Sequence, residues 1–245
     1  MTTIVSAYVD IKKPKGQWTR EKYLERGKLL LEMDVPKVVF LEETVIKQFG
    51  AAYLAALPKT AIVPYKKEQL LLNELVAEGA SVELPKPPPR ETEPSLDYLS
   101  IQINKTEWVR QAVAINPHDT AQFMWIDFGI YHIFKDPAIF KECVLNCQNK
   151  AYDNVRIAGI WGLNRVMSEY QIRNTPLWFF AGGVFGGDKD KLLVFADKLK
   201  EKTREVIKKG YVMWEVNLWY LVCLENRELF DSYSSDHNLS ILSNY

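Results

Sequence analysis

The sequence predicts a single α/β domain with a mainly parallel central sheet and helices on its faces. Two observations support this fold class. Short β-branched and apolar segments alternate with longer helical ones from the N-terminus onward, an order that is typical of parallel sheets. A longer apolar run, Phe123–Ile130, has the composition of a fully buried strand. With 245 residues and 47% apolar content, the chain is long enough to bury one sizeable core.

The expected strands are short and mostly rich in β-branched, aliphatic or aromatic residues. They are Thr3–Val9, Lys37–Leu41, Ala61–Tyr65, Phe123–Ile130, Val155–Trp161 and Leu177–Phe185.

The expected helices begin at residues that suit a helix N-terminus, such as the cap Thr19 or the proline at position 137. The helix that follows Asp188 or Asp190 has an apolar stripe and many lysines, which indicates a half-exposed surface helix. The helices cover Thr19 to about Met33, Val45–Phe49, Glu68–Glu78, Asp97–Asn116, Pro137–Gln148, Asp188 to Lys209 and Trp214–Leu224.

Two segments interrupt this alternation. The first is the basic loop Lys12–Gly16. The second is Leu84–Pro94, whose prolines exclude a helix or a central strand and favour an extended backbone. It is either a connecting loop or a proline-rich ligand for a partner domain. A domain boundary is disfavoured here, because the strands before it have too few partners to fold alone.

Charge and cysteine content exclude several classes of protein. Lysine plus arginine balance aspartate plus glutamate at 31 each, so nucleic acid is not an expected partner. Three cysteines, an odd number, argue against a disulfide framework. The sequence shows no signal peptide and no apolar segment long enough to span a membrane. We therefore expect a cytoplasmic protein without a transmembrane segment, and a peripheral membrane contact stays open.

Asp127 is the first candidate site residue. It interrupts the apolar run at the point where the buried strand is expected to end. A carboxylate there is unfavourable unless a divalent cation, a backbone N–H or an arginine pairs with it. The other interpretation is a turn former before Gly129.

His237 is a candidate partner for Asp127. It follows Asp236 in the polar C-terminal segment, where a histidine can equally be a plain surface residue. One carboxylate and one imidazole, completed by water and phosphate oxygens, suit Mn²⁺. His132, close to Asp127 in sequence, is a weaker competitor.

Two further segments carry candidate chemistry. Gly182 and Gly183, with a second glycine pair at 186 and 187, indicate either tight turns or a close approach of a ligand to the backbone. Glu215 lies in an apolar context, so it is either paired or functional. Burial would raise its proton affinity and suit acid/base catalysis, and Asn217 nearby could orient a hydroxyl group.

Taken together, these motifs resemble the HtrL/YibB family of bacterial surface-polysaccharide loci, which is similar to glycosyltransferases of the GT-A fold. The resemblance spans nearly the whole chain, with the motifs in one order. They are Ile4–Tyr8, Met124–Ile130, Phe180–Gly187, Trp214–Asn217, Asp236–Asn238 and the terminal Ile241–Tyr245.

The resemblance implies roles for these residues. It implies a GT-A-like domain over 1–245, with a nucleotide-binding half at about 1–130 and an acceptor half at about 131–245. Ala7, Tyr8 and Asp10 would lie near the nucleotide base, Gly182 and Gly183 near the sugar. Glu215 would be the acidic residue beside the reacting carbon. Asp127 and His237 would bind Mn²⁺ or Mg²⁺, with the C-terminal tail becoming ordered over the donor when nucleotide binds.

One motif departs from the family pattern. GT-A enzymes use Asp-x-Asp to hold the metal, and here Gly129 replaces the second aspartate, so metal independence is an open alternative. A cation must still stabilise the departing nucleoside diphosphate. Lys105 and Arg110 are candidates for that charge, or else they are ordinary exposed helix positions.

The expected function is therefore transfer of a sugar, with a UDP-linked nucleotide-sugar donor and a glycan or glycolipid acceptor, dependent on Mn²⁺. The alternatives are a non-catalytic carbohydrate- or nucleotide-binding member of the fold, and a nucleotide-sugar hydrolase.

Overall fold

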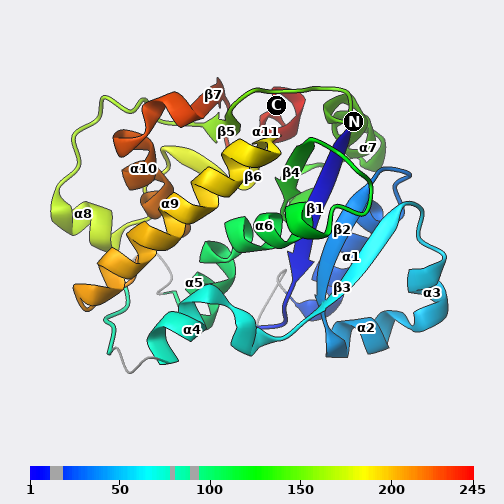
Figure 1. Ribbon diagram of the computed structural model, residues 1–245, viewed down its shortest axis with the longest axis horizontal. Helices are drawn as coiled ribbons and strands as arrows, with labels where there is room; N and C mark the ends of the chain where they lie inside the picture. Colours follow the sequence, from blue (N-terminus) through cyan, green and yellow to red (C-terminus); the bar gives the residue numbers. More distant parts are fainter. Residues whose placement is uncertain (12–18, 78–80, 89–93) are drawn as a thin grey trace.

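The computed structural model describes residues 1–11, 19–77, 81–88 and 94–245. The expected basic loop Lys12–Gly16 lies outside the described residues, as do residues 89–93 of the proline-containing segment. The described part contains one seven-stranded sheet in the order β3-β2-β1-β4-β6-β5-β7 (Figure 1). Its strands are β1 (Thr2–Tyr8), β2 (Lys37–Glu42), β3 (Thr60–Tyr65), β4 (Gln122–Ile126), β5 (Val155–Gly159), β6 (Phe180–Asp188) and β7 (Phe230–Ser234).

The sheet is mainly parallel, as the sequence predicts. The β1–β2, β1–β4, β2–β3 and β5–β7 pairs are parallel. Strand β6 runs antiparallel to both of its neighbours, β4 and β5. The start of β6 therefore lies at the same edge of the sheet as the carboxyl ends of the parallel strands.

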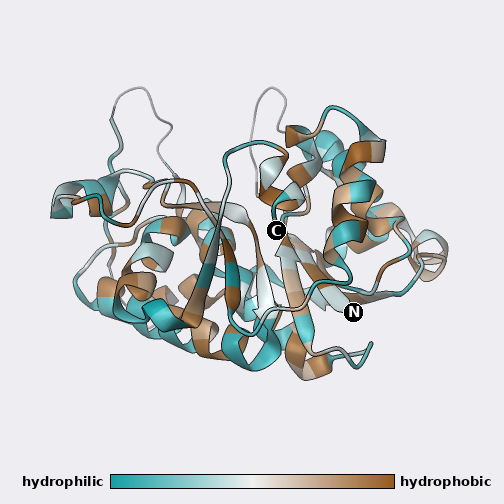
Figure 2. Cartoon of the chain, turned by 90° about the horizontal axis from the view of Figure 1, so that it is seen from above, coloured by the Kyte–Doolittle hydropathy of each residue, from teal (hydrophilic) through white to brown (hydrophobic). Residues whose placement is uncertain are grey.

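Helices cover both faces of the sheet (Figure 1), and hydrophilic and hydrophobic residues alternate along them (Figure 2). One face packs against α4, α5, α6, α9 and α10 through the largest apolar cluster, and the other against α1, α7 and α11. The helices are α1 (Arg20–Leu31), α2 (Glu43–Phe49), α3 (Ala51–Ala55), α4 (Leu71–Ala77), α5 (Leu96–Ile103), α6 (Lys105–Ile115), α7 (Pro137–Cys147), α8 (Glu169–Asn174), α9 (Lys189–Lys208), α10 (Glu215–Glu225) and α11 (Ser240–Ser243), with short 3₁₀ turns η2 (Lys67–Gln69), η3 (Ile130–Ile133) and η4 (Arg227–Leu229). None of the described helices has the length and apolarity needed to cross a bilayer.

Several element boundaries differ from the sequence prediction. The single helix expected over Asp97–Asn116 is two helices that meet at Asn104. The buried Asn104 side chain accepts a hydrogen bond from the Leu71 amide (2.9 Å), so the two helices meet at a residue that contacts a distant segment of the chain. The strand expected over Phe123–Ile130 ends at Ile126, and Ile130 begins the 3₁₀ turn η3. Strand β7 was not predicted.

The C-terminal tail is part of the core. Ile241, Leu242 and Tyr245 are buried in the apolar cluster around α7. The Tyr233 hydroxyl also donates a 2.7 Å hydrogen bond to the Ile241 carbonyl. The expectation that the tail becomes ordered only over bound nucleotide is therefore wrong for these residues, since apolar side chains hold them in place without it.

The glycine pair Gly186–Gly187 is required by close strand packing. A Cβ atom at Gly186 would lie 2.2 Å from the Tyr245 hydroxyl and 2.6 Å from the Phe123 carbonyl oxygen of β4. A Cβ atom at Gly187 would lie 2.1 Å from the Asn154 carbonyl oxygen, and Gly187 has a positive φ of 132°. Both positions have packing reasons that involve no ligand.

We expect Gly186→Ala to destabilise the protein by about 1–3 kcal/mol, because the added methyl group meets backbone atoms that cannot move freely. Gly159→Ala on the neighbouring strand β5 is the matched control, since its nearest atom lies 3.4 Å away. Urea unfolding followed by circular dichroism measures both. Equal stability of the two variants would contradict the packing argument.

Candidate functional site

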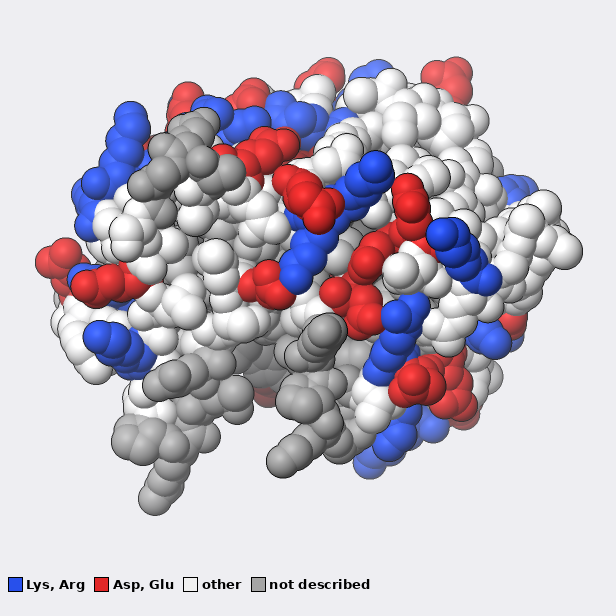
Figure 3. Space-filling view, turned by 90° about the horizontal axis from the view of Figure 1, so that it is seen from below, with Lys and Arg blue, Asp and Glu red and all other residues white. Residues whose placement is uncertain are grey.

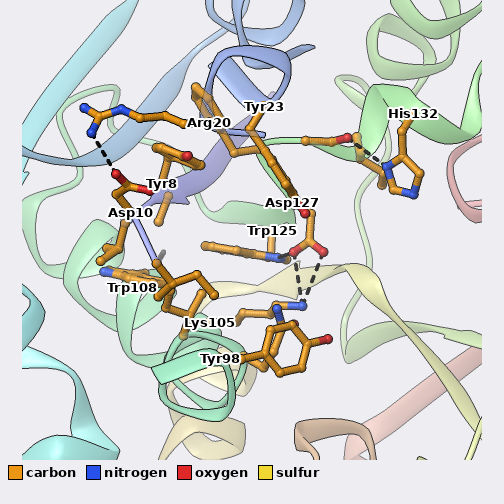
Figure 4. Close-up of a pocket in the computed structure, with 18 residues that line it drawn as sticks. Tyr8, Asp10, Arg20, Tyr23, Tyr98, Lys105, Trp108, Trp125, Asp127 and His132 are labelled. Atoms are coloured by element: carbon orange, nitrogen blue, oxygen red, sulfur yellow. Dashed lines mark hydrogen bonds and ion pairs between the residues drawn. The ribbon is translucent and has the colours of Figure 1, made fainter. Parts of the chain in front are cut away.

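A pocket of about 370 Å³ opens where the sheet's parallel strands end. This is the edge at which open α/β sheets bind ligands. The lining comes from the ends of β1 and β4, from α1, and from α5 and α6 (Figure 4). The lining residues are Ala7, Tyr8, Val9, Asp10, Ile11, Arg20, Tyr23, Tyr98, Ile101, Gln102, Lys105, Trp108, Trp125, Asp127, Phe128, Gly129, Ile130 and His132. Figure 3 shows the molecule from below, with basic and acidic side chains interleaved on that face.

Aromatic rings form much of the pocket wall. The Tyr8 ring lies 5.9 Å from that of Tyr23 and 5.4 Å from that of Phe128, centroid to centroid. Trp108 of α6 and Trp125 of β4 stack in parallel, 5.6 Å apart with an interplanar angle of 5°. Both tryptophans are buried beneath the pocket, whereas the half-exposed Tyr8 and Tyr23 rings suit contact with a planar ring or the apolar face of a sugar.

Two glycines allow α1 to approach the end of β4. A Cβ atom at Gly27 would lie 1.9 Å from the Phe128 ring, and one at Gly129 would lie 2.5 Å from the Tyr23 ring. Tyr23 therefore fills the space that a side chain at position 129 would need.

Lys105 is the centre of the polar network. Its side chain is 3% exposed, and its Nζ lies 3.1 Å from Asp127 Oδ1 and 3.4 Å from Oδ2. Nζ also donates to the Gly182 carbonyl (2.9 Å) and lies 3.3 Å from Glu215 Oε1. One buried ammonium thus joins the end of β4, the start of β6 and the first residue of α10.

Asp127 is the pocket-facing carboxylate of this network. Its side chain is 36% exposed, and its Oδ1 also accepts a 2.7 Å hydrogen bond from Trp125 Nε1. Its backbone amide donates to the Gly183 carbonyl, which extends the β4–β6 pairing past Ile126. The strand, the indole and the ammonium together fix the orientation of the carboxylate.

The environment shifts the proton affinity of the two buried groups. Burial alone would lower the pKa of Lys105, but the negative charges of Asp127 and Glu215 outweigh it, so the pKa is raised and the ammonium is favoured. Burial raises the pKa of Glu215, and the charge of Asp127 adds to this effect, while Lys105 opposes it. The site therefore favours a charged lysine between an exposed and a buried carboxyl group.

Glu215 lies behind Lys105 and is not among the lining residues. A Cβ atom at Gly182 would lie 2.5 Å from Glu215 Oε1, so only glycine lets β6 pass this close to the carboxyl group. A Cβ atom at Gly183 would lie 3.7 Å from Asp127 Oδ2. This glycine pair thus borders the network on both sides.

The rim of the pocket carries a second ion pair. Arg20 Nη1 lies 2.7 Å from Asp10 Oδ2, and the Asp10 amide donates to Glu42 Oε2 (2.9 Å). Arg20 is the first residue of α1, directly after the cap Thr19. Asp10 follows the end of β1, so both charges are placed by elements that the sequence predicts.

The structure brings most of the predicted site residues together. The pocket is lined by Ala7, Tyr8, Asp10, Lys105 and Asp127. Gly182 and Glu215 contact Lys105, and Gly183 lies beside Asp127.

Two predicted site residues lie away from the pocket lining. Arg110 pairs with Asp197 of α9 (2.8 Å) and with Glu107, at the contact between α6 and α9. Asn217 is fully buried and donates to the carbonyls of Ile172 and Thr175, both at 2.7 Å. Both side chains hold helices in place, and neither is among the described residues that line the pocket.

The expected metal site does not fit this arrangement. Both Asp127 oxygens already contact Lys105. The His237 ring packs edge-on against Trp178, 4.3 Å between centroids, and is not part of the pocket lining. Within residues 1–11, 19–77, 81–88 and 94–245, no three histidine, cysteine or acidic side chains form a group that could hold a metal ion. We therefore derive no chemical step through a metal.

Sequence reasoning missed several lining residues, including Arg20, Tyr23, Tyr98 and the two stacked tryptophans. One local signal was available. Tyr98, Ile101, Gln102 and Lys105 follow the i, i+3, i+4, i+7 spacing of a single helical face. The others depend on pairing between distant segments, which spacing does not reveal.

Comparisons with known proteins add similarities of fold. No protein-family model and no curated protein matches the sequence, so the HtrL/YibB membership stays an expectation. The structure is similar to that of mouse xyloside xylosyltransferase 1 in its apo form, with a TM-score of 0.47 and 13% identity over 95% of this chain and 84% of that one. It is also similar to that of Rv0371C from Mycobacterium tuberculosis H37Rv in complex with manganese, with a TM-score of 0.42 and 9% identity over 96% and 88% of the two chains. These values assign neither a substrate nor a metal to this chain.

We expect Lys105→Met to destabilise the protein by about 3–5 kcal/mol, because it leaves the buried Glu215 and the partly exposed Asp127 without their counter-ion. Adding Glu215→Gln removes one of those groups, so the double variant should regain part of the loss. Urea unfolding of the wild type, both single variants and the double variant gives the coupling energy. Strict additivity would show that the two side chains are not coupled.

Proposed function

We propose that the protein is a GT-A-type glycosyltransferase, which moves a sugar from a nucleotide-sugar donor, expected to be UDP-linked, to a glycan or glycolipid acceptor. The observation that carries this proposal is the aromatic pocket at the carboxyl ends of β1 and β4, with Asp127 facing into it. A volume of about 370 Å³ and a lining that combines aromatic rings with charged and polar side chains are typical of small-molecule sites.

The nucleotide would occupy the part of the pocket formed by the first half of the chain. Among the described residues that line the pocket, all except His132 belong to residues 1–130, which is the half proposed to bind the nucleotide. The Tyr8, Tyr23 and Phe128 rings can hold a base by stacking and apolar contact. Arg20 and Asp10 at the rim offer both donors and an acceptor to the base or ribose.

The transfer of the sugar requires a group that accepts a proton and residues that hold this group in position. The bond between the sugar carbon and the donor diphosphate breaks as the acceptor oxygen bonds to that carbon, and the acceptor hydroxyl loses its proton. Asp127 faces the pocket and can accept that proton. Glu215 touches Lys105 instead of the pocket, so its proposed role is to position Lys105 and, through it, Asp127.

One observation favours a second candidate function. Tyr23 leaves no room for a second carboxylate at position 129, and Asp127 already accepts hydrogen bonds from two residues. The same pocket could therefore serve a non-catalytic protein that binds a nucleotide or a carbohydrate.

A panel of nucleotide sugars tests the proposal. A donor that binds only the folded protein should raise its melting temperature. Asp127→Asn keeps the shape of the side chain and removes its charge. We expect it to lower turnover of the best donor by about two to four orders of magnitude, the usual range for a lost acid/base group. Asp153→Asn, an exposed carboxylate before β5, is the control and should retain full turnover.

The readouts separate the candidates. Sugar transfer that requires an acceptor supports the transferase, and release of free sugar without acceptor indicates a hydrolase. Binding without any turnover supports the non-catalytic candidate. If no nucleotide sugar binds, the proposed function is wrong.

A further inference from the structure

We propose that the ammonium of Lys105 is the built-in counter-ion of Asp127, and that a nucleoside diphosphate binds in this pocket without a divalent metal ion. The nature of the ligand rests on the proposed function, whereas the pairing of Lys105 with Asp127 is a feature of the structure. The inference opposes the expectation of a Mn²⁺ centre at Asp127 and His237, and one set of measurements distinguishes the two.

Asp127 already accepts hydrogen bonds from two side chains of the protein. Lys105 Nζ lies within 3.4 Å of both carboxylate oxygens, and Trp125 Nε1 donates to Oδ1 at 2.7 Å. A metal ion binds the lone pairs of the same oxygens. It would therefore compete with donors that the protein holds in place.

Lys105 is held in place by further acceptors besides Asp127. Its Nζ is also bound to the Gly182 carbonyl and Glu215 Oε1, and its side chain is 3% exposed. Moving the ammonium aside would leave these acceptors unsatisfied in the protein interior, which is unfavourable. A metal bound beside an unmoved ammonium would repel it, since both are cations.

In the part of the chain that the structure describes, no group of three metal-ligating side chains surrounds Asp127. Position 129, where an Asp-x-Asp motif would supply a second carboxylate, is a glycine packed against the Tyr23 ring. Hard divalent cations need several oxygen ligands, and one carboxylate that already binds an ammonium is a poor site.

A diphosphate in the pocket would meet the negative charge of Asp127. An isolated Asp127 carboxylate would repel the diphosphate, and this repulsion is the reason to expect a metal. The Lys105 ammonium cancels that charge within the protein. The Arg20 guanidinium at the rim is already paired with Asp10, so Lys105 is the cation that offsets the charge of Asp127.

Calorimetric titration of UDP into the wild-type protein is the first test. We expect the same dissociation constant in EDTA and in Mn²⁺, within about twofold, which is a small free-energy difference. A loss of affinity of about tenfold or more in EDTA would overturn the inference.

The second test removes the ammonium. In Lys105→Met/Glu215→Gln, Asp127 keeps its charge and loses its counter-ion, so Mn²⁺ should now raise UDP affinity by about tenfold or more. Glu215→Gln alone is the matched variant that keeps Lys105, and should stay insensitive to Mn²⁺. Circular dichroism verifies that each variant is folded. A double variant that is folded and binds UDP equally well with and without Mn²⁺ would contradict the proposal.

A third measurement stays valid if UDP is not the ligand. Mn²⁺ alone, followed by electron paramagnetic resonance, should not bind to the wild-type pocket at micromolar concentrations and should bind more tightly to the double variant. Tight binding to the wild type that Asp127→Asn abolishes would overturn the inference. Failure of UDP to bind under every condition would count against the proposed function, while the Mn²⁺ titration would still decide the role of Lys105.

Discussion

The contact between the Lys105 ammonium and the Asp127 carboxylate is the interaction on which the rest of the site depends. A charged lysine is tolerated in the interior only with charged or polar partners, and here these come from β4, β6 and α10. Each partner brings a segment that is distant in sequence to the same point. The polar network therefore ties the two halves of the chain together beneath the pocket.

The antiparallel strand β6 is what makes this network possible. Because it runs against β4 and β5, its first residues reach the edge where the parallel strands end. A Cβ atom at Gly182 would lie 2.5 Å from Glu215 Oε1, so the absence of a side chain lets the strand pass close to that carboxyl group. The Gly182 carbonyl also accepts a hydrogen bond from Lys105. The glycines at 186 and 187 serve packing further along the strand. One glycine-rich motif thus has two separate physical causes.

Much of the fold and part of the site could be predicted from the sequence. Apolar runs and alternation of elements identify the parallel strands, and a carboxylate at the end of a buried run identifies Asp127. The break at Asn104, strand β7 and the partners of Arg110 and Asn217 could not be predicted, because each depends on contacts between residues that are far apart in the chain. The packing of Gly129 against Tyr23 likewise depends on a contact between distant segments of the chain.

The stacked indoles explain how Lys105 and Asp127 come to face each other. Trp108 lies three residues after Lys105, and Trp125 lies two residues before Asp127. The spacing of three places Lys105 and Trp108 on one face of α6, and the spacing of two places Trp125 and Asp127 on one side of the extended chain. The parallel stack of the two rings, 5.6 Å between centroids, sets the register of α6 on β4. The Trp125 Nε1–Asp127 hydrogen bond then joins the apolar stack to the ion pair. Packing of two buried tryptophans therefore determines where the charges of the site are held.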